Sequence, residues 1–150
     1  DGEMVYNLSA VSSRGVGVAT ANTYDFIHWR KYESKQYKNE YNLQMLRESN
    51  KGTLLLYNRE NDKTDNRIAI ISKKGEVKHQ LQFNGIVTDI AYKNNHIYCV
   101  SDTKAYILDM DGKIVRSADC GFGVVRFSVI SPNTIEAGEV RKVGLSPVKN

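Results

Sequence analysis

The segment 87-VTDIAYKNNHIYCVSDTKAYILDMDGKIVRSAD-119 gives the strongest indication of the fold. It divides into four apolar runs of strand length, separated by three short polar turns. Tyr, Ile, Val and Thr fill the runs, whereas Asn, Asp and Gly fill the turns, where positive φ angles are common. The expected strands are 87–92, 96–101, 104–109 and 113–119. The stretch therefore predicts a four-stranded antiparallel meander, a sheet with two faces to cover and two edges to protect.

The meander is one copy of a repeat of 37 residues. At this spacing Gly75 aligns with Gly112, and Val77 aligns with Ile114. A fainter copy lies upstream at a spacing of 36, with Asn39 in the place of Gly75. Four strands in a repeat of this length are typical of a β-propeller blade. We predict an all-β protein, a β-propeller or partial propeller of about three to four four-stranded antiparallel blades.

Residues 105–124, AYILDMDGKIVRSADCGFGV, resemble the repeat of quinoprotein-like (PQQ-type) β-propellers. The resemblance extends over roughly residues 52–145. That repeat carries a Trp shortly after the turn glycine, and this chain has none there, so no cofactor is expected. The segment 122–146, FGVVRFSVISPNTIEAGEVRKVGLS, is similar to the last blade of uncharacterised membrane-anchored propeller proteins of Gram-positive bacteria. This second likeness implies a bacterial cell-surface or extracytoplasmic domain with a membrane-anchored parent chain; a cytoplasmic location is the alternative.

The chain of 150 residues is expected to form a single propeller over 1–150 or the C-terminal part of a larger one. Three to four blades are few for a closed ring, and the sequence begins Asp-Gly-Glu without an initiator Met. These observations favour a piece of a longer chain. The other possibilities are a ring that closes with few blades and a ring completed by a partner chain, as in a homodimer.

The rest of the sequence supplies strands for the neighbouring blades. The expected strands are 4–12, 16–22, 24–32, 38–46, 53–58, 67–72, 76–83, 124–130, 134–137 and 141–145. Polar loops are expected at 33–37 and 59–66. The innermost strand of the second blade is either 43–48 or replaced by helix around 44–49, and a fourth strand for the last blade must come from elsewhere.

Composition excludes several classes of protein. Cys99 and Cys120 are too few for a disulfide scaffold and are expected to be buried free thiols. The net charge of +4 is mild, and Lys and Arg are scattered through turns among acidic residues, which predicts an ordinary surface and no nucleic-acid site. The sequence has no apolar run long enough to span a membrane and no signal peptide.

No catalytic residue and no metal site is predicted. Asp109-Met110-Asp111-Gly112 begins like a calcium loop, but Cys120 occupies the position of the final glutamate, so a hairpin turn is expected. The histidines are far apart, and no nucleophile motif is present. Tyr24, Phe26 and His28 share one face of a strand and Trp29 lies on the other, so this aromatic region is expected to be mostly core.

The repeat singles out two sets of residues. Asp89 and Arg126 occupy equivalent positions in successive blades, so as channel-lining residues they would form an opposite-charge pair. Such a pair either sets the register of the blades or forms the polar floor of a ligand site. The corner residues Asn84, Asp102 and Phe122 are expected on one rim, where Phe122 is a candidate protein contact.

Three functions remain open. The first is a non-enzymatic binding or scaffold domain that presents rim loops to a protein partner. The second is a small-molecule binder or an enzyme with its site at the mouth of the channel. The third is a purely structural part of a larger propeller. Since propellers host unrelated activities, the fold does not choose among them.

Overall fold

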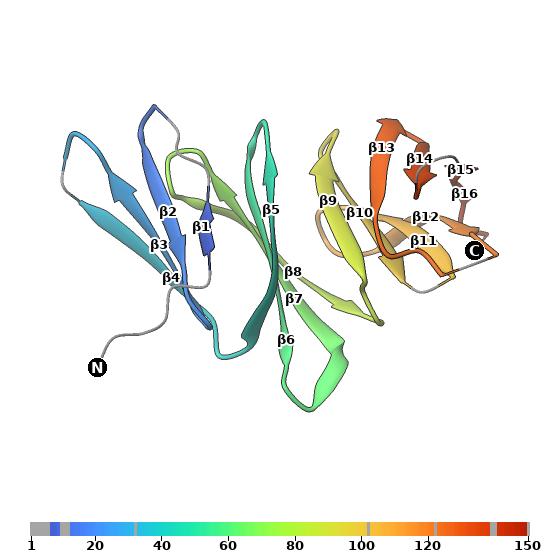
Figure 1. Ribbon diagram of the computed structural model, residues 1–150, viewed down its shortest axis with the longest axis horizontal. Helices are drawn as coiled ribbons and strands as arrows, with labels where there is room; N and C mark the ends of the chain where they lie inside the picture. The colour runs from blue at the N-terminus through green and yellow to red at the C-terminus, as the bar shows by residue number, and fades with distance from the viewer. Residues whose placement is uncertain are drawn as a thin grey trace.

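The computed structural model describes residues 7–9, 13–31, 33–101, 103–121, 123–138 and 141–149, and its sixteen strands form four antiparallel sheets, here called blades (Figure 1). Blade 1 contains β1 (Asn7–Ser9), β2 (Gly15–Ala19), β3 (Thr23–His28) and β4 (Ser34–Lys38). Blade 2 contains β5 (Asn42–Ser49), β6 (Gly52–Arg59), β7 (Asp62–Ser72) and β8 (Val77–Asn84). Blade 3 contains β9 (Asp89–Lys93), β10 (His96–Ser101), β11 (Lys104–Leu108), β12 (Ile114–Asp119) and β16 (Ser146–Pro147). Blade 4 contains β13 (Phe127–Ser131), β14 (Thr134–Ala137) and β15 (Arg141–Gly144).

The first strands of the blades, β1, β5, β9 and β13, neighbour one another in that order. Figure 1 shows β5, β9 and β13 side by side, with the later strands of each blade leading away from them. This radial arrangement of antiparallel meanders is that of a β-propeller. The predicted all-β fold, a partial propeller of three to four blades, is therefore confirmed. The described part of the chain contains no helix that is long and apolar enough to cross a membrane.

Apolar side chains fill the spaces between successive blades. β6 is buried along almost its whole length because both of its faces are covered. Leu54 and Leu56 pack with the core that blade 2 shares with blade 3, while Leu55 and Tyr57 pack toward blade 1. Alternation along a strand explains this division. The repeat is thus stabilised by the same layer of buried side chains between each pair of blades.

The predicted burial of the two cysteines is confirmed. Cys99 lies in the core between blades 2 and 3, and Cys120 in the core between blades 3 and 4. Both thiols are free. Burial raises the pKa of Cys99 from 9.0 to about 12.

The 37-residue repeat is confirmed at the turn between the third and fourth strands of a blade. Gly75 and Gly112 have φ angles of +81° and +82°, and their amides donate to the carbonyls of Ser72 and Asp109 at 2.9 and 3.1 Å. The Ser72 hydroxyl and the Asp109 carboxylate each accept two further backbone N–H bonds within their turn. Side-chain acceptors of this kind favour a tight turn, and glycine supplies its left-handed residue.

Blade 1 differs from the expected strand boundaries. Residues 34–37, predicted as part of the loop 33–37, form β4 together with Lys38. Residues 39–41 cross to blade 2, so the later part of the predicted strand 38–46 belongs to the inner strand β5 and not to the outer strand of blade 1. β3 ends at His28 rather than at residue 32. The alternative of helix around 44–49 is also wrong, because β5 supplies the inner strand of blade 2. Of the predicted strand 4–12, only 7–9 lies within the described residues.

The charged segment 59–66, predicted as a loop, mostly continues as strand. β7 begins at Asp62, and Arg59 pairs with it across a two-residue turn. The guanidinium groups of Arg59 and Arg67 lie 5.0 and 5.1 Å from the centre of the Tyr41 ring. The Tyr41 hydroxyl donates to Asp65 at 2.9 Å. The charged side chains of this segment thus have partners within the sheet. For this reason a polar sequence can continue the hairpin as strand.

The last residues of the chain return to blade 3. After β15, Leu145 is buried among blades 3 and 4, and β16 pairs antiparallel with β12. Arg116 donates to the carbonyl of Leu145 at 3.0 Å, and the Val148 amide donates to the carbonyl of Val115 at 3.3 Å. Within the described residues blade 4 therefore has three strands, and its expected fourth strand is not supplied.

Candidate functional site: the inner groove and the basic rim

Asp89 is the buried carboxylate at the centre of the molecule. It begins β9, and its side chain is 8% exposed. Its Oδ1 accepts from Nε and Nη2 of Arg47 at 3.2 and 3.0 Å and from the amide of Ile90 at 2.9 Å. Its Oδ2 accepts from the amide of Phe127 at 3.2 Å. Because Arg47 is on β5 and Phe127 starts β13, one carboxylate joins the inner strands of three blades.

Arg126, the partner predicted for Asp89, takes no part in this arrangement. Its side chain is exposed, and no described ion pair links it to Asp89. Asp89 pairs instead with Arg47 of the preceding blade. Every oxygen of the carboxylate is occupied by a protein donor, so Asp89 acts in this structure as a link between blades.

A groove of about 390 Å³, here called the inner groove, lies over β5, β9 and β13. Its lining includes Arg47, Asp89, Tyr92, Lys93 and Phe127. The groove is therefore of mixed polarity, with the guanidinium of Arg47, the ammonium of Lys93, the phenol of Tyr92 and the carboxylates of Glu48 and Asp89 beside apolar walls. It is the place where the channel-mouth site was expected, but its buried carboxylate is already satisfied by Arg47 and backbone amides.

The predicted corner residues are only partly within the described chain. Asn84 ends β8, is exposed, and accepts a hydrogen bond from Gln82 at 3.2 Å. Asp102 and Phe122 lie outside the described residues, so the predicted contact through Phe122 stays a prediction. The described residues hold no cluster of three or more metal-ligating side chains.

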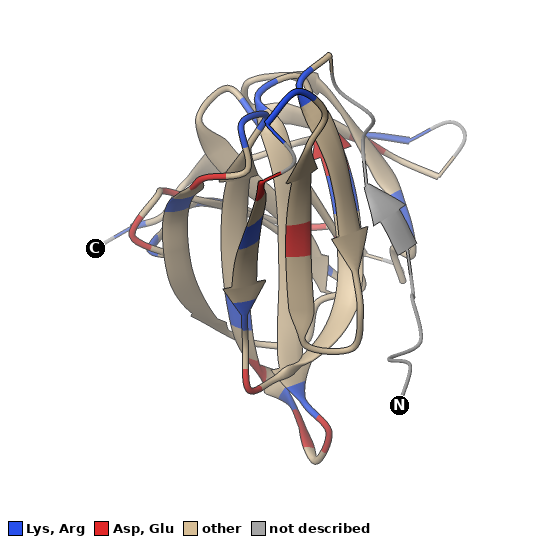
Figure 2. Ribbon diagram, turned by 90° about the vertical axis from the view of Figure 1, so that its left-hand side faces the viewer, with Lys and Arg blue, Asp and Glu red and all other residues tan. Residues whose placement is uncertain are grey.

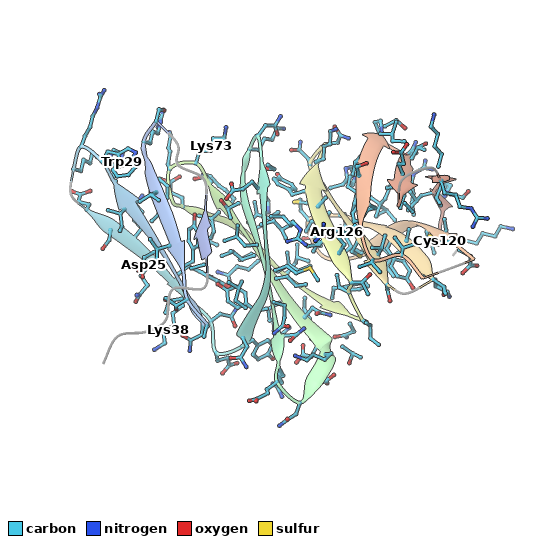
Figure 3. All side chains as sticks on the ribbon, in the orientation of Figure 1. Asp25, Trp29, Lys38, Lys73, Cys120 and Arg126 are labelled. Atoms are coloured by element: carbon cyan, nitrogen blue, oxygen red, sulfur yellow. The ribbon has the colours of Figure 1, made fainter. Side chains whose placement is uncertain are left out.

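Basic side chains gather at the opposite rim, on the turns that join β1 to β2, β3 to β4 and β7 to β8. We call this surface the basic rim, and it comprises Arg14, Trp29, Arg30, Lys31, Lys73 and Lys74. Figure 2 shows Lys and Arg concentrated in the loops at one end of the molecule. Figure 3 shows Trp29 and Lys73 at this end and Lys38 at the other. All six side chains are exposed, and Trp29 is 47% exposed.

This surface was not predicted, because its basic residues are far apart in the sequence. Arg14 immediately precedes β2, and Lys74 follows β7; the two residues come close because these strand ends lie at the same rim. The signal that was available is the propeller itself, in which first-to-second and third-to-fourth strand turns share one rim. The misplaced fourth strand of blade 1 hid the turn that carries Trp29.

The family assignment comes from the sequence comparisons. The chain belongs to DUF5711, a family of unknown function, which matches residues 7–137. No curated protein matches the chain.

Solved structures show the same fold at low sequence identity. A protein of unknown function from Bacteroides caccae has a TM-score of 0.60 at 11% identity, over 95% of this chain and 61% of that one. Hsv2 from Kluyveromyces lactis has a TM-score of 0.58 at 14% identity, over 89% of this chain and 45% of that one. Hsv2 from Kluyveromyces marxianus gives 0.54 at 14% identity, over 79% and 37%. This chain therefore spans between about a third and three fifths of the length of these structures.

Proposed function

We propose that this chain is a non-enzymatic binding domain whose basic rim docks on an acidic surface of a partner protein. The observation that carries the proposal is Trp29, which is 47% exposed among the basic residues of the rim. Buried aromatic anchors contribute much of the binding energy of an interface. Surrounding Lys and Arg side chains steer an oppositely charged partner and fix its orientation.

The reactive groups elsewhere support a binding role over an enzymatic one. The Asp89 carboxylate accepts hydrogen bonds from Arg47 and from backbone amides of two inner strands. Burial raises the pKa of Cys99 and of Cys120, so neither thiol is a ready nucleophile. A function that needs only surface complementarity fits this distribution of side chains.

Trp29 makes the proposal directly testable, because it is the single Trp of the chain. Titration with polyglutamate is expected to change its fluorescence in a saturable and salt-sensitive way. A variant with Arg14→Ser, Lys31→Ser and Lys74→Ser is expected to lose at least tenfold in affinity. This variant lacks three positive charges of the basic rim, and the attraction between such charges and an acidic partner is strongest at close range.

A matched control removes the same charge from the other end of the molecule. The variant Lys38→Ser, Lys63→Ser, Lys104→Ser changes exposed residues outside the basic rim and has the same net charge as the rim variant. It is expected to bind like the unmodified chain. Equal losses in the two variants would show non-specific attraction. Binding to phosphatidylserine vesicles but not to polyglutamate would point to a membrane surface instead; either outcome overturns the proposal.

A second candidate function is to complete a larger ring. Blade 4 has three strands in the described chain, and Val125 and Ile130 nearby are exposed. Either more chain or a second copy would cover this end. Light scattering tests the second-copy form, since a monomer at all concentrations contradicts a homodimer. The likeness to quinoprotein-like repeats, the bacterial source and the extracytoplasmic, membrane-anchored location stay proposals; fractionation of the native parent chain tests the last.

A further inference from the structure

A groove of about 290 Å³ lies within the basic rim, between blades 1 and 2. We call it the rim groove. Phe26 and His28 of β3 line it together with four basic side chains, Arg14, Lys31, Lys35 and Lys74. Its carboxylates are Glu33 and Glu76. The groove is therefore a concave surface with an excess of positive charge, in contrast to the convex turns around it.

The walls of the rim groove are held in place by close packing. Phe26 is 3% exposed, and its ring lies against both Gly15 of its own blade and Gly75 of blade 2. A Cβ atom at Gly75 would overlap the Phe26 ring. The β7–β8 turn is thus seated on blade 1, which fixes the backbone that carries Lys74 next to β3. The amide of Trp29 donates to the carbonyl of Arg14 at 3.0 Å, and this bond ties a third turn to the same site.

The charges of the groove are unevenly matched. Glu76 interacts with Lys35 at 3.6 Å and with Lys78 at 3.1 Å, and these ammonium groups lower its pKa. Lys31 and Lys74 form no ion pair with any residue in the described part of the chain. Glu76 is therefore already paired, whereas the ammonium groups of Lys31 and Lys74 have no ion-pair partner among the described residues. A negatively charged ligand would pair with them.

His28 adds a titratable group to this site. Its Nδ1 is buried and has no hydrogen-bond partner among the described residues. The His28 side chain is only partly buried and lines the groove. An imidazole N–H donates a hydrogen bond to an oxyanion.

We propose that the rim groove binds one oxyanion group, a carboxylate or a phosphoryl group, with His28, Lys31 and Lys74 as its ligands. This inference rests on the proposed function and names the chemistry that the acidic partner places in the rim. Charge-assisted hydrogen bonds from two ammonium groups and one imidazole suit such a group. Neighbouring Trp29 then covers the apolar part of the same partner.

The site is tested by NMR titration with two small probes, inorganic sulfate and glutarate. The three histidines His28, His79 and His96 give separate ring resonances and serve as internal controls. His79 is on β8 and His96 on β10, both away from the groove. The His28 resonance is expected to shift saturably with at least one probe, before the other two move. A response to sulfate alone indicates a phosphoryl ligand, and a response to glutarate indicates a carboxylate.

Variants make the test specific. Lys74→Ser is expected to weaken probe binding about tenfold, because one charge-assisted hydrogen bond is lost. His28→Phe keeps most of the ring volume but lacks the imidazole nitrogens, so it is also expected to weaken probe binding.

Two results would overturn the inference. One is that the three histidine resonances shift together or not at all. The other is that Lys74→Ser, an exposed position that does not threaten the fold, binds the probes normally. The proposed function would survive either result if the rim variant still lost polyglutamate binding. Loss of the histidine response together with unchanged polyglutamate binding in the rim variant would remove both proposals.

Discussion

The link between Arg47 and Asp89 can be measured with a double-mutant cycle. The variants are Arg47→Met, which keeps the aliphatic stem, Asp89→Asn, which keeps the shape, and the combination of both. Asp89 is 8% exposed and Arg47 is 43% exposed, so the pair is only partly screened by water. We expect a coupling free energy of about 1–2 kcal/mol, below that of a fully buried pair because the guanidinium reaches solvent. Asp89→Asn alone should cost about 2 kcal/mol, since it also weakens the bond from the Phe127 amide.

The assay is urea unfolding followed by far-ultraviolet circular dichroism, which reports all four blades together. The same cycle with Arg126→Met in place of Arg47→Met is the control, because Arg126 occupies the repeat-equivalent position but is exposed. Its coupling to Asp89 should be within about 0.5 kcal/mol of zero. A coupling to Arg126 as large as that to Arg47 would refute the assignment of Asp89 to the preceding blade. So would an Arg47 coupling near zero.

Two further predictions concern packing and pH. Gly75→Ala should lower the free energy of unfolding in urea by about 2–3 kcal/mol, because the new Cβ overlaps the Phe26 ring. Gly121→Ala is the control: Gly121 is also at positive φ but has open space around it, so the substitution should cost about 1 kcal/mol. Equal costs would mean that the Phe26 ring moves aside and contributes no steric penalty. The pKa of Cys99 is raised from 9.0 to about 12 by burial, so the folded state keeps its thiol proton where the unfolded state loses it. The free energy of unfolding is therefore unaffected by this thiol below pH 9, and it falls by about 1.4 kcal/mol per pH unit between pH 9 and pH 12. Cys99→Ala should flatten the decline in urea midpoint between pH 8 and pH 10, and an unchanged decline would contradict the assignment.

The repeat in the sequence predicted most of the fold because it reports local chemistry. Glycine at positions 75 and 112 and a side-chain acceptor three residues before each define one turn, and that turn fixes the phase of two blades. Alternating apolar residues then place each strand. The fourth strand of blade 1, residues 34–38, was misplaced because it is polar and almost wholly exposed, so hydrophobic periodicity gives no signal there.

The partner of Asp89 could not be found from the repeat. In an ideal propeller, residues one repeat apart lie at the same level along the channel axis, and on this basis Arg126 was predicted as the partner of Asp89. The partner in the structure, Arg47, lies 42 residues before Asp89 rather than 37. The β6–β7 hairpin of blade 2 is longer than the β10–β11 hairpin of blade 3, so the spacing between inner strands differs from the repeat. Long-range pairing across inner strands therefore has to be read from the structure.

The return of β16 to blade 3 changes how the C-terminal blade should open. In a repeat array each unit is held mainly by its contacts with the neighbouring units. Here the chain leaves blade 3 after Asp119 and pairs with it again at Ser146, so blade 4 lies inside a closed loop. While β16 stays paired, any opening of blade 4 has to take place within this loop, which limits how far β13 and β14 separate from blade 3. Detachment of the two-residue strand is therefore expected to speed amide exchange in β13 and β14.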